Sequence, residues 1–246
     1  MKNILIISIL VFASSFSYGQ YPEGKELLEK IDENMSSDSR IFTSTMIIHG
    51  RRGSRNIESK TWAEGEDNSF TEYLAPAREQ GTKMLKLEDL LWMYSPTTDR
   101  IIKISGHMLR QSVMGSDLSY EDMLDDRKLT NSYDATVNAE EDYNDISCWV
   151  IDLKANTEEI AYDSRKIWVD KNKFIPMKQE LFAKSGKLLK RMEMSDVVRV
   201  QGRWFPRKMI FKDILKEGQG TEFIINDIQF NIPIPPDVLN KGSLKK

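Results

Sequence analysis

The chain has 246 residues and a formal net charge of −3, from 35 basic and 38 acidic side chains. The charges of both signs are mixed along the chain, whereas nucleic-acid-binding domains usually present a clustered basic face. We therefore expect no nucleic-acid partner. The chain has one cysteine, Cys148, which excludes an internal disulfide and leaves pairing between chains or a free thiol. Its strand-like surroundings, Cys148–Leu153, favour a buried and inert thiol.

The N-terminal stretch, residues 1–19, has the pattern of a secretion signal. Lys2 gives it a positive start, Ile4–Phe16 is mostly apolar, and Ser17-Tyr18-Gly19 offers small residues at a cleavage site. The apolar run has 13 residues, which is too short for a membrane span of about 20. We expect cleavage after Gly19 and a mature chain, residues 20–246, that forms one domain in an exported compartment.

Along the mature chain, Gly24–Met35 has the periodicity of a short amphipathic helix. Most of the rest alternates between apolar and polar residues, with Gly, Asn and Asp between the runs, as in strands joined by short turns. Residues 237–246 are expected to form a short tail. Outside the central segment described below, strands are expected near Phe42–Ile48, Ile57–Glu64, Asn68–Leu74, Thr130–Asn138, Cys148–Leu153, Arg165–Asp170, Ile175–Ala183, Leu188–Val200, Trp204–Ile214 and Glu222–Asn231.

About eleven short strands in succession predict a mainly β fold with a few helices, in which one antiparallel sheet curls. The strands carry apolar residues on one face and charged residues on the other, as expected when only one face is covered. We expect the helices to lie against the concave face of the sheet. Large apolar side chains that point into the same space would then line a pocket.

The central segment, residues 79–124, is the least ordinary part of the chain. Two strand-like runs are followed by a loop that carries Met108, Leu109, Val113 and Met114, although loops are usually polar. Met suits surfaces that accept variable apolar shapes, so these residues either line an apolar ligand site or are plain core beneath a long loop. We expect Gly106–Asp117 to form a mobile rim or lid over the pocket.

The same segment ends in a helix signal. Ser119 is expected to cap a short helix, with Asp122 as the acidic residue of a capping box.

The candidate pocket residues are the large apolar side chains in and around this segment, although any one of them could be ordinary core. Arg100 or Arg110 is a candidate for meeting a lipid head group at the pocket mouth, since the guanidinium group binds phosphate or carboxylate at two points. The alternative is that such charged residues only tie strand ends together. The apolar candidates are Trp62, Phe70, Tyr73, Met84, Trp92, Tyr94, Met108, Leu109 and Met114.

The sequence contains no recognisable catalytic or metal-binding pattern. The two histidines, His49 and His107, lie in no nucleophile–base arrangement of recognisable spacing, and no Gly-x-Ser-x-Gly motif is present. No pair of ligands has zinc or calcium spacing. We therefore expect neither an enzyme nor a metal or other cofactor.

A series of motifs runs through residues 73–125. They are Tyr73-Leu74-x-Pro76-Ala77-Arg78-Glu79, Gly81-Thr82-Lys83-Met84-Leu85, Leu91-Trp92-Met93-Tyr94-Ser95-Pro96, Asp99-Arg100, Lys103–Ser112, Met114-Gly115-Ser116-Asp117 and Ser119-Tyr120-Glu121-Asp122. With these motifs the segment resembles the LolA-like family of outer-membrane lipoprotein-sorting proteins. The resemblance implies an open β-barrel, or half barrel, wrapped over a helical plug with an apolar cavity between them.

The function implied by the resemblance is that of a periplasmic, chaperone-like carrier. Its cargo would be lipid or the acyl chains of lipoproteins, held in the cavity for transfer toward the outer membrane. Its partners would include an inner-membrane transporter and an outer-membrane acceptor. The alternative is a non-enzymatic interaction or sensor module that binds protein on the concave face of the sheet.

Overall fold

The computed structural model describes residues 21–50, 53–125, 128–157 and 160–246. The predicted signal peptide, residues 1–19, lies outside the described residues and remains a prediction. The first element, α1 (Gly24–Met35), has the predicted bounds. In the described ranges no helix is long and apolar enough to cross a membrane.

Helix α1 packs against one end of a large sheet. Its apolar stripe, Leu27, Leu28 and Ile31, is almost completely buried. It packs in a cluster with side chains from three strands of the C-terminal half of the chain. Gly24 allows this close approach, because a Cβ atom at that position would lie 2.3 Å from the carbonyl oxygen of Ala135. The helix is therefore held by burial of its apolar face rather than by its ends.

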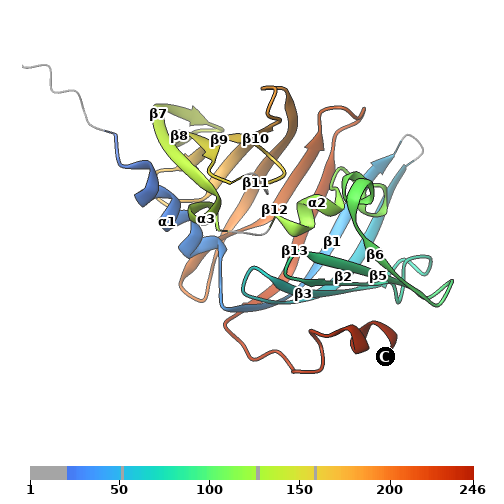
Figure 1. Cartoon of the computed structure of the whole chain (residues 1–246). Coiled ribbons are helices and arrows are strands. Elements are labelled where there is room, and N and C mark those ends of the chain that lie inside the picture. The colour runs from blue at the N-terminus through green and yellow to red at the C-terminus, as the bar shows by residue number, and fades with distance from the viewer. Residues whose placement is uncertain (1–20, 51–52, 126–127, 158–159) are drawn as a thin grey trace, which may run out of the picture.

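All strands of the described residues belong to one antiparallel sheet (Figure 1). The sheet has 13 strands in the order β6-β5-β4-β3-β2-β1-β13-β12-β11-β10-β9-β8-β7. Two series of consecutive hairpins, β1–β6 and β7–β13, meet where β1 pairs with β13. The bounds are β1 (Ser39–Gly50), β2 (Gly53–Glu64), β3 (Asn68–Ala75), β4 (Lys83–Leu87), β5 (Leu90–Ser95), β6 (Arg100–Ile104), β7 (Tyr133–Tyr143), β8 (Ile146–Ala155), β9 (Ser164–Asp170), β10 (Pro176–Phe182), β11 (Leu188–Val200), β12 (Arg203–Asp213) and β13 (Thr221–Phe230).

The predicted fold class, a mainly β chain with an open curled sheet and a few helices, is confirmed, but the described residues contain more strands than the expected eleven or so. Strands β4 and β5 form one apolar run in the sequence, and only the two-residue turn Glu88–Asp89 separates them. Glu88 adopts a φ of 53° there, the left-handed conformation that tight hairpin turns require.

The expected strand Thr130–Asn138 begins too early. A short helix, α3 (Leu129–Ser132), precedes β7, and the carboxylate of Asp32 on α1 explains why. It accepts hydrogen bonds from the backbone N–H groups of Leu129 and Thr130, each at 3.0 Å. The first backbone N–H groups of this helix, which have no partner within the helix, are thus capped by a residue almost 100 positions earlier in the chain. The residues next to the helix in the sequence therefore carry no signal for it.

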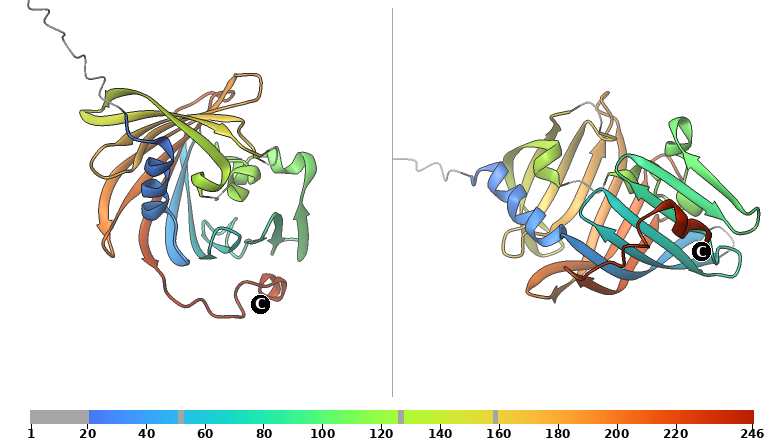
Figure 2. Two further views of the ribbon diagram at one scale, coloured as in Figure 1. Left: turned by 60° about the vertical axis from the view of Figure 1, so that its left-hand side comes forward. Right: turned by 60° about the horizontal axis from the view of Figure 1, so that its bottom comes forward.

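The chain between β6 and β7 closes the concave side of the curled sheet. Because β6 and β7 are the two opposite edge strands, their connection must pass from one edge to the other, and it does so inside the curl (Figure 2). The described part of this connection contains η1 (Gly106–Arg110), η2 (Val113–Gly115), α2 (Tyr120–Leu124) and α3. We call residues 105–125 the lid segment.

The predicted helix start at Ser119 is confirmed. The Ser119 hydroxyl accepts a hydrogen bond from the backbone N–H of Asp122, and the Asp122 carboxylate accepts one from the backbone N–H of Ser119 at 2.6 Å. The expected tail, residues 237–246, instead ends in a short 3-10 helix, η3 (Lys241–Lys245), that lies outside the curl against β4 and β5 (Figures 1 and 2). Leu244 of this segment has no exposed surface.

Candidate functional site

A cavity of about 370 Å³ lies between the concave face of the sheet and the helices that cover it. This volume is within the range of about 300–1,000 Å³ typical of small-molecule sites. The lining is mostly apolar and unusually rich in flexible thioether side chains. Its methionines and phenylalanines are Met35, Met46, Met123, Met192, Met194, Met209, Phe42, Phe205, Phe211 and Phe223.

Several polar side chains that line the cavity are hydrogen-bonded to neighbours. Ser59 pairs with Ser44 at 2.9 Å, and Thr61 pairs with Thr71 at 2.9 Å. Asp32 is engaged by the backbone and side chain of α3. These groups therefore carry no unmet demand for hydrogen bonds from a ligand.

Charged residues at the lid end of the cavity hold the lid segment on the sheet. Residues directly opposite each other on neighbouring strands share a face, so Arg165 of β9 and Lys190 of β11, which both oppose Leu181 of β10, point to the same side. Arg165 forms an ion pair with Asp125, and Lys190 forms one with Asp122. All four side chains are at most 13% exposed.

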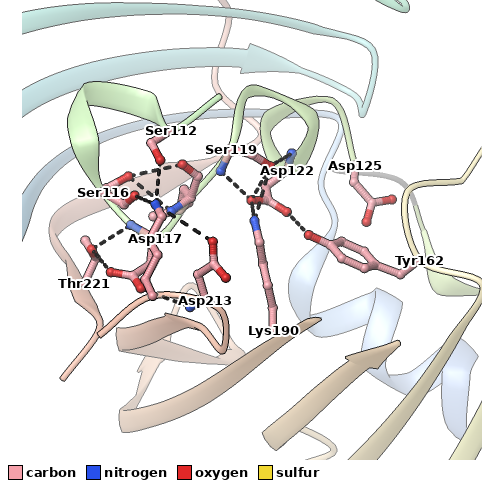
Figure 3. A network of polar contacts seen from close by, with 12 residues as sticks. Ser112, Ser116, Asp117, Ser119, Asp122, Asp125, Tyr162, Lys190, Asp213 and Thr221 are labelled. Atoms are coloured by element: carbon pink, nitrogen blue, oxygen red, sulfur yellow. Dashed lines mark hydrogen bonds and ion pairs between the residues drawn. The ribbon is translucent and has the colours of Figure 1, made fainter. Parts of the chain in front are cut away.

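The Asp122 carboxylate is the centre of this network (Figure 3). It accepts hydrogen bonds from Lys190, from the Tyr162 hydroxyl and from Ser119. Burial, followed by the nearby Asp122 charge, raises the pKa of Tyr162 far above its ordinary value. The phenol is therefore neutral at physiological pH and remains a hydrogen-bond donor to Asp122.

A second set of contacts fixes the middle of the lid segment (Figure 3). The Asp117 carboxylate accepts hydrogen bonds from the Thr221 hydroxyl at 2.8 Å and from the backbone N–H of Asp213 at 3.0 Å. Lys216 donates to the Ser112 hydroxyl at 2.5 Å and to the Ser116 carbonyl at 2.6 Å. Together with the ion pairs of Asp122 and Asp125, these contacts tie the lid segment to β9 and to the ends of β11–β13.

The apolar residues singled out from the sequence lie on two faces of the sheet. Tyr73 lines the cavity, and burial raises its pKa above the ordinary value. Tyr73 and Met84 are buried in one apolar cluster. Met108, Leu109 and Met114 of the lid segment are half-buried and pack against this cluster. These residues form the layer that supports one wall of the cavity, although only Tyr73 among them contacts the cavity itself.

The other four, Trp62, Phe70, Trp92 and Tyr94, form a cluster with Leu244 of the C-terminal segment. Direct cross-strand pairs place them on the face opposite to Thr61 and Thr71, which line the cavity. The sequence indicated their burial but not that the end of the chain covers them from outside. Lys241 also lies over the Trp92 ring, with Nζ 4.1 Å from the ring centroid.

The two arginines considered for a head group are both exposed and lie apart from the cavity lining. Arg100 begins β6, opposite Ser95. Arg110 ends η1 and borders a separate polar hollow of about 400 Å³ that Lys190 and Lys216 also line. Of the two, Arg110 is therefore the one next to the lid contacts.

Eleven of the 31 residues that line the cavity come from β9–β13, outside the central segment in which the pocket was predicted. On β11, Met192 and Met194 share the face that lines the cavity. A signal was present in β10, where Met177, Gln179 and Leu181 share one parity and Gln179 interrupts an otherwise apolar face.

Cys148 is buried, with no exposed surface, as the sequence predicted. Burial, followed by the Asp170 charge, raises the pKa of its thiol to about 11, so the thiol is protonated and unreactive near neutral pH. Across the described ranges, no group of three or more His, Cys, Asp and Glu side chains is placed to hold a metal ion.

Comparison with known proteins places this fold. A family model described as "Uncharacterized protein" matches residues 65–246. No sequence among curated proteins matches the chain.

Three solved structures share the fold over most of their length. An outer membrane lipoprotein-sorting protein domain from Vibrio parahaemolyticus is 22% identical, with 91% of this chain and 98% of that chain covered and a TM-score of 0.77. A DUF1329 family protein from Desulfovibrio piger is 24% identical, with 90% and 97% covered and a TM-score of 0.80. A LolA superfamily protein from Nitrosomonas europaea is 23% identical, with 90% and 99% covered and a TM-score of 0.75.

Proposed function

Since the chain belongs to the family whose model matches residues 65–246 and has the fold of LolA superfamily and lipoprotein-sorting proteins, we propose that it is a non-enzymatic carrier of lipid or lipoprotein acyl chains. The observation that carries the proposal is the Met- and Phe-lined cavity of about 370 Å³ beneath the lid segment. Transfer of an acyl chain from water into such a cavity gains about 0.8 kcal/mol per buried CH₂.

A carrier must release its cargo, and two features of the site support release. Methionine side chains are flexible and adapt to variable apolar shapes, so the wall can follow a ligand without a rigid fit. Beside the apolar packing of Val113 and Tyr120, polar contacts made by Asp117, Asp122 and Asp125 hold the lid segment on the sheet. Such contacts can exchange with water when the segment lifts, which gives the cargo a path in and out.

The predicted compartment and partners follow from the same proposal. An exported carrier would work in the periplasm, receive cargo from an inner-membrane transporter and deliver it to an outer-membrane acceptor. The alternative, a protein-binding module that uses the concave face, needs an open groove. Helices α1, α2 and α3 cover that face (Figure 2), which favours a small enclosed ligand.

A fluorescence titration with the apolar probe N-phenyl-1-naphthylamine tests the proposal. Met192→Trp should fill part of the cavity and weaken probe binding about tenfold or more, while overpacking costs about 1–3 kcal/mol of stability. Ser195→Trp is the matched control, because Ser195 lies on the same strand, exposed on the opposite face. Absence of probe binding by the wild type, or equal binding by both variants, would contradict the proposal.

A further inference from the structure

Gln179 is a polar side chain in the cavity wall with an unused hydrogen-bonding atom. It lines the cavity and is only 5% exposed. Its Oε1 atom is buried and has no hydrogen-bond partner among the described residues. Buried polar atoms in proteins are nearly always paired, so an exception calls for an explanation such as a missing ligand.

The position of Gln179 in the sheet makes the exception more pronounced. Directly paired residues on β8–β12 form one row on the concave face, and Gln179 is its only polar member. The row runs Ile151, Ile167, Gln179, Met192, Phe211. A leucine or methionine would complete this row without an unpaired amide, whose burial costs stability. The amide is therefore best explained by what it meets inside the cavity.

The charges around the cavity argue against a charged ligand group at this point. Arg165 is committed to Asp125 and Tyr133, and Lys190 is committed to Asp122. A ligand anion would lie in a lining that carries three carboxylates, those of Asp32, Asp122 and Asp125, against two guanidinium groups, those of Arg40 and Arg165. A carboxylate also lacks the proton that an acceptor such as Gln179 Oε1 requires.

We propose that the cavity selects an uncharged lipid-like ligand whose single buried polar group, a hydroxyl or an amide N–H, donates a hydrogen bond to Gln179 Oε1. This inference rests on the proposed carrier function and narrows its ligand class. A hydroxyl fits well, because it both donates and accepts, as the glutamine amide does. The apolar body of the ligand would lie along the methionine-rich wall of β11 and β12.

Displacement of the bound naphthylamine probe by three ligands of equal chain length tests this selection. The ligands are 1-tetradecanol, its methyl ether and tetradecanoate. The wild type should bind the alcohol about fivefold or more tightly than the ether, because only the alcohol can donate to the buried acceptor. It should bind the carboxylate more weakly than the alcohol.

Gln179→Leu should abolish the preference for the alcohol while the ether binds as well as before. Its melting temperature should be unchanged or higher, since an apolar side chain replaces an unpaired amide. Gln179→Met is a second variant if leucine packs poorly. Ser195→Leu is the matched control: it replaces an exposed polar side chain on the opposite face of β11, and it should keep the preference.

The outcomes separate this inference from the proposed function. If the wild type binds the probe and all three ligands without preferring the alcohol, or if Gln179→Leu keeps the preference, the role of Gln179 is overturned and the carrier function stands. If the wild type binds neither probe nor ligands, the carrier function itself fails, and the inference fails with it.

Discussion

Lys190 of β11 and Asp122 of α2 form an ion pair in which the side chains are only 11% and 12% exposed. The pair joins the sheet to the lid segment at the lid end of the cavity. Removing one partner of a buried pair leaves an uncompensated charge, and the usual cost is about 3–5 kcal/mol. The pair therefore contributes to holding the lid segment on the sheet.

Lys190→Met should loosen the lid segment, because the Asp122 carboxylate loses its cation while remaining buried. Hydrogen exchange measured by mass spectrometry should become faster in residues 112–124, and the melting temperature should fall by several degrees. Lys187→Met, an exposed change on the same hairpin, is the control and should leave both unchanged. Unaltered exchange in the lid segment of Lys190→Met would show that this pair does not hold it.

The C-terminal segment should stabilise the sheet without taking part in ligand binding. Leu244 is fully buried against Phe70, Leu85 and Trp92 on the face away from the cavity. Leu244→Ala should cost about 2–5 kcal/mol, as large-to-small core changes do. Thermal unfolding and probe titration on the same variant check this: the melting temperature should fall and probe affinity at 20 °C should hold. A loss of affinity in folded protein would place the C-terminal segment in the site.

The stability of the strand junction should depend on pH through Glu222. This carboxylate on β13 contacts Lys208 of β12 at 2.5 Å and His49 of β1 at 2.9 Å. The hydrogen bond from Lys208, then that from His49, lowers the pKa of Glu222 below its ordinary value of 4.5. A lowered folded-state pKa means that the unfolded chain binds the proton more readily, so this contribution is full above about pH 4.5 and is lost as the pH falls through the folded pKa.

Glu222→Gln should therefore be less stable than the wild type near pH 7, and the difference should shrink as the pH is lowered from about 5 to 3. Urea unfolding at a series of pH values measures it. A constant difference between the two proteins across this range would refute the assignment.

The signal peptide remains a prediction from the charged start, the short apolar run and the small residues at 17–19. Export of the full chain from a bacterial host should yield a mature protein that begins at Gln20. N-terminal sequencing of the exported protein checks this. An intact Met1, or a start many residues from Gln20, would be the opposing result.

The local signals in the sequence were sufficient for elements that are stabilised locally. Gly24–Met35 carries its own amphipathic pattern, and the Ser119–Asp122 capping box lies within four residues. Helix α3 has no such signal, because its cap comes from Asp32 through the tertiary fold. The same reasoning explains why β4 and β5 read as one run: the turn between them has only two residues.

The candidate site was harder to predict, for a physical reason. Alternation along β2–β5 shows that two faces exist but not which one is concave, and here both faces are apolar because the C-terminal segment covers the outer one. The sequence alone therefore does not distinguish Trp62 and Trp92, which face away from the cavity, from Tyr73, which lines it. The position of the wall formed by β9–β13 depends on the pairing of β1 with β13. These two strands lie far apart in the sequence.

The central claim is that the cavity beneath the lid segment holds an apolar ligand, and mass spectrometry of organic extracts from the purified protein tests it most directly. Extracts of the wild type should contain a lipid or other long-chain amphiphile approaching one molecule per protein chain. Extracts of Met192→Trp, in which the cavity is partly filled, should contain much less of it, and those of Ser195→Trp should match the wild type. Wild-type protein free of such ligands, or equal amounts in the two variants, would contradict the account.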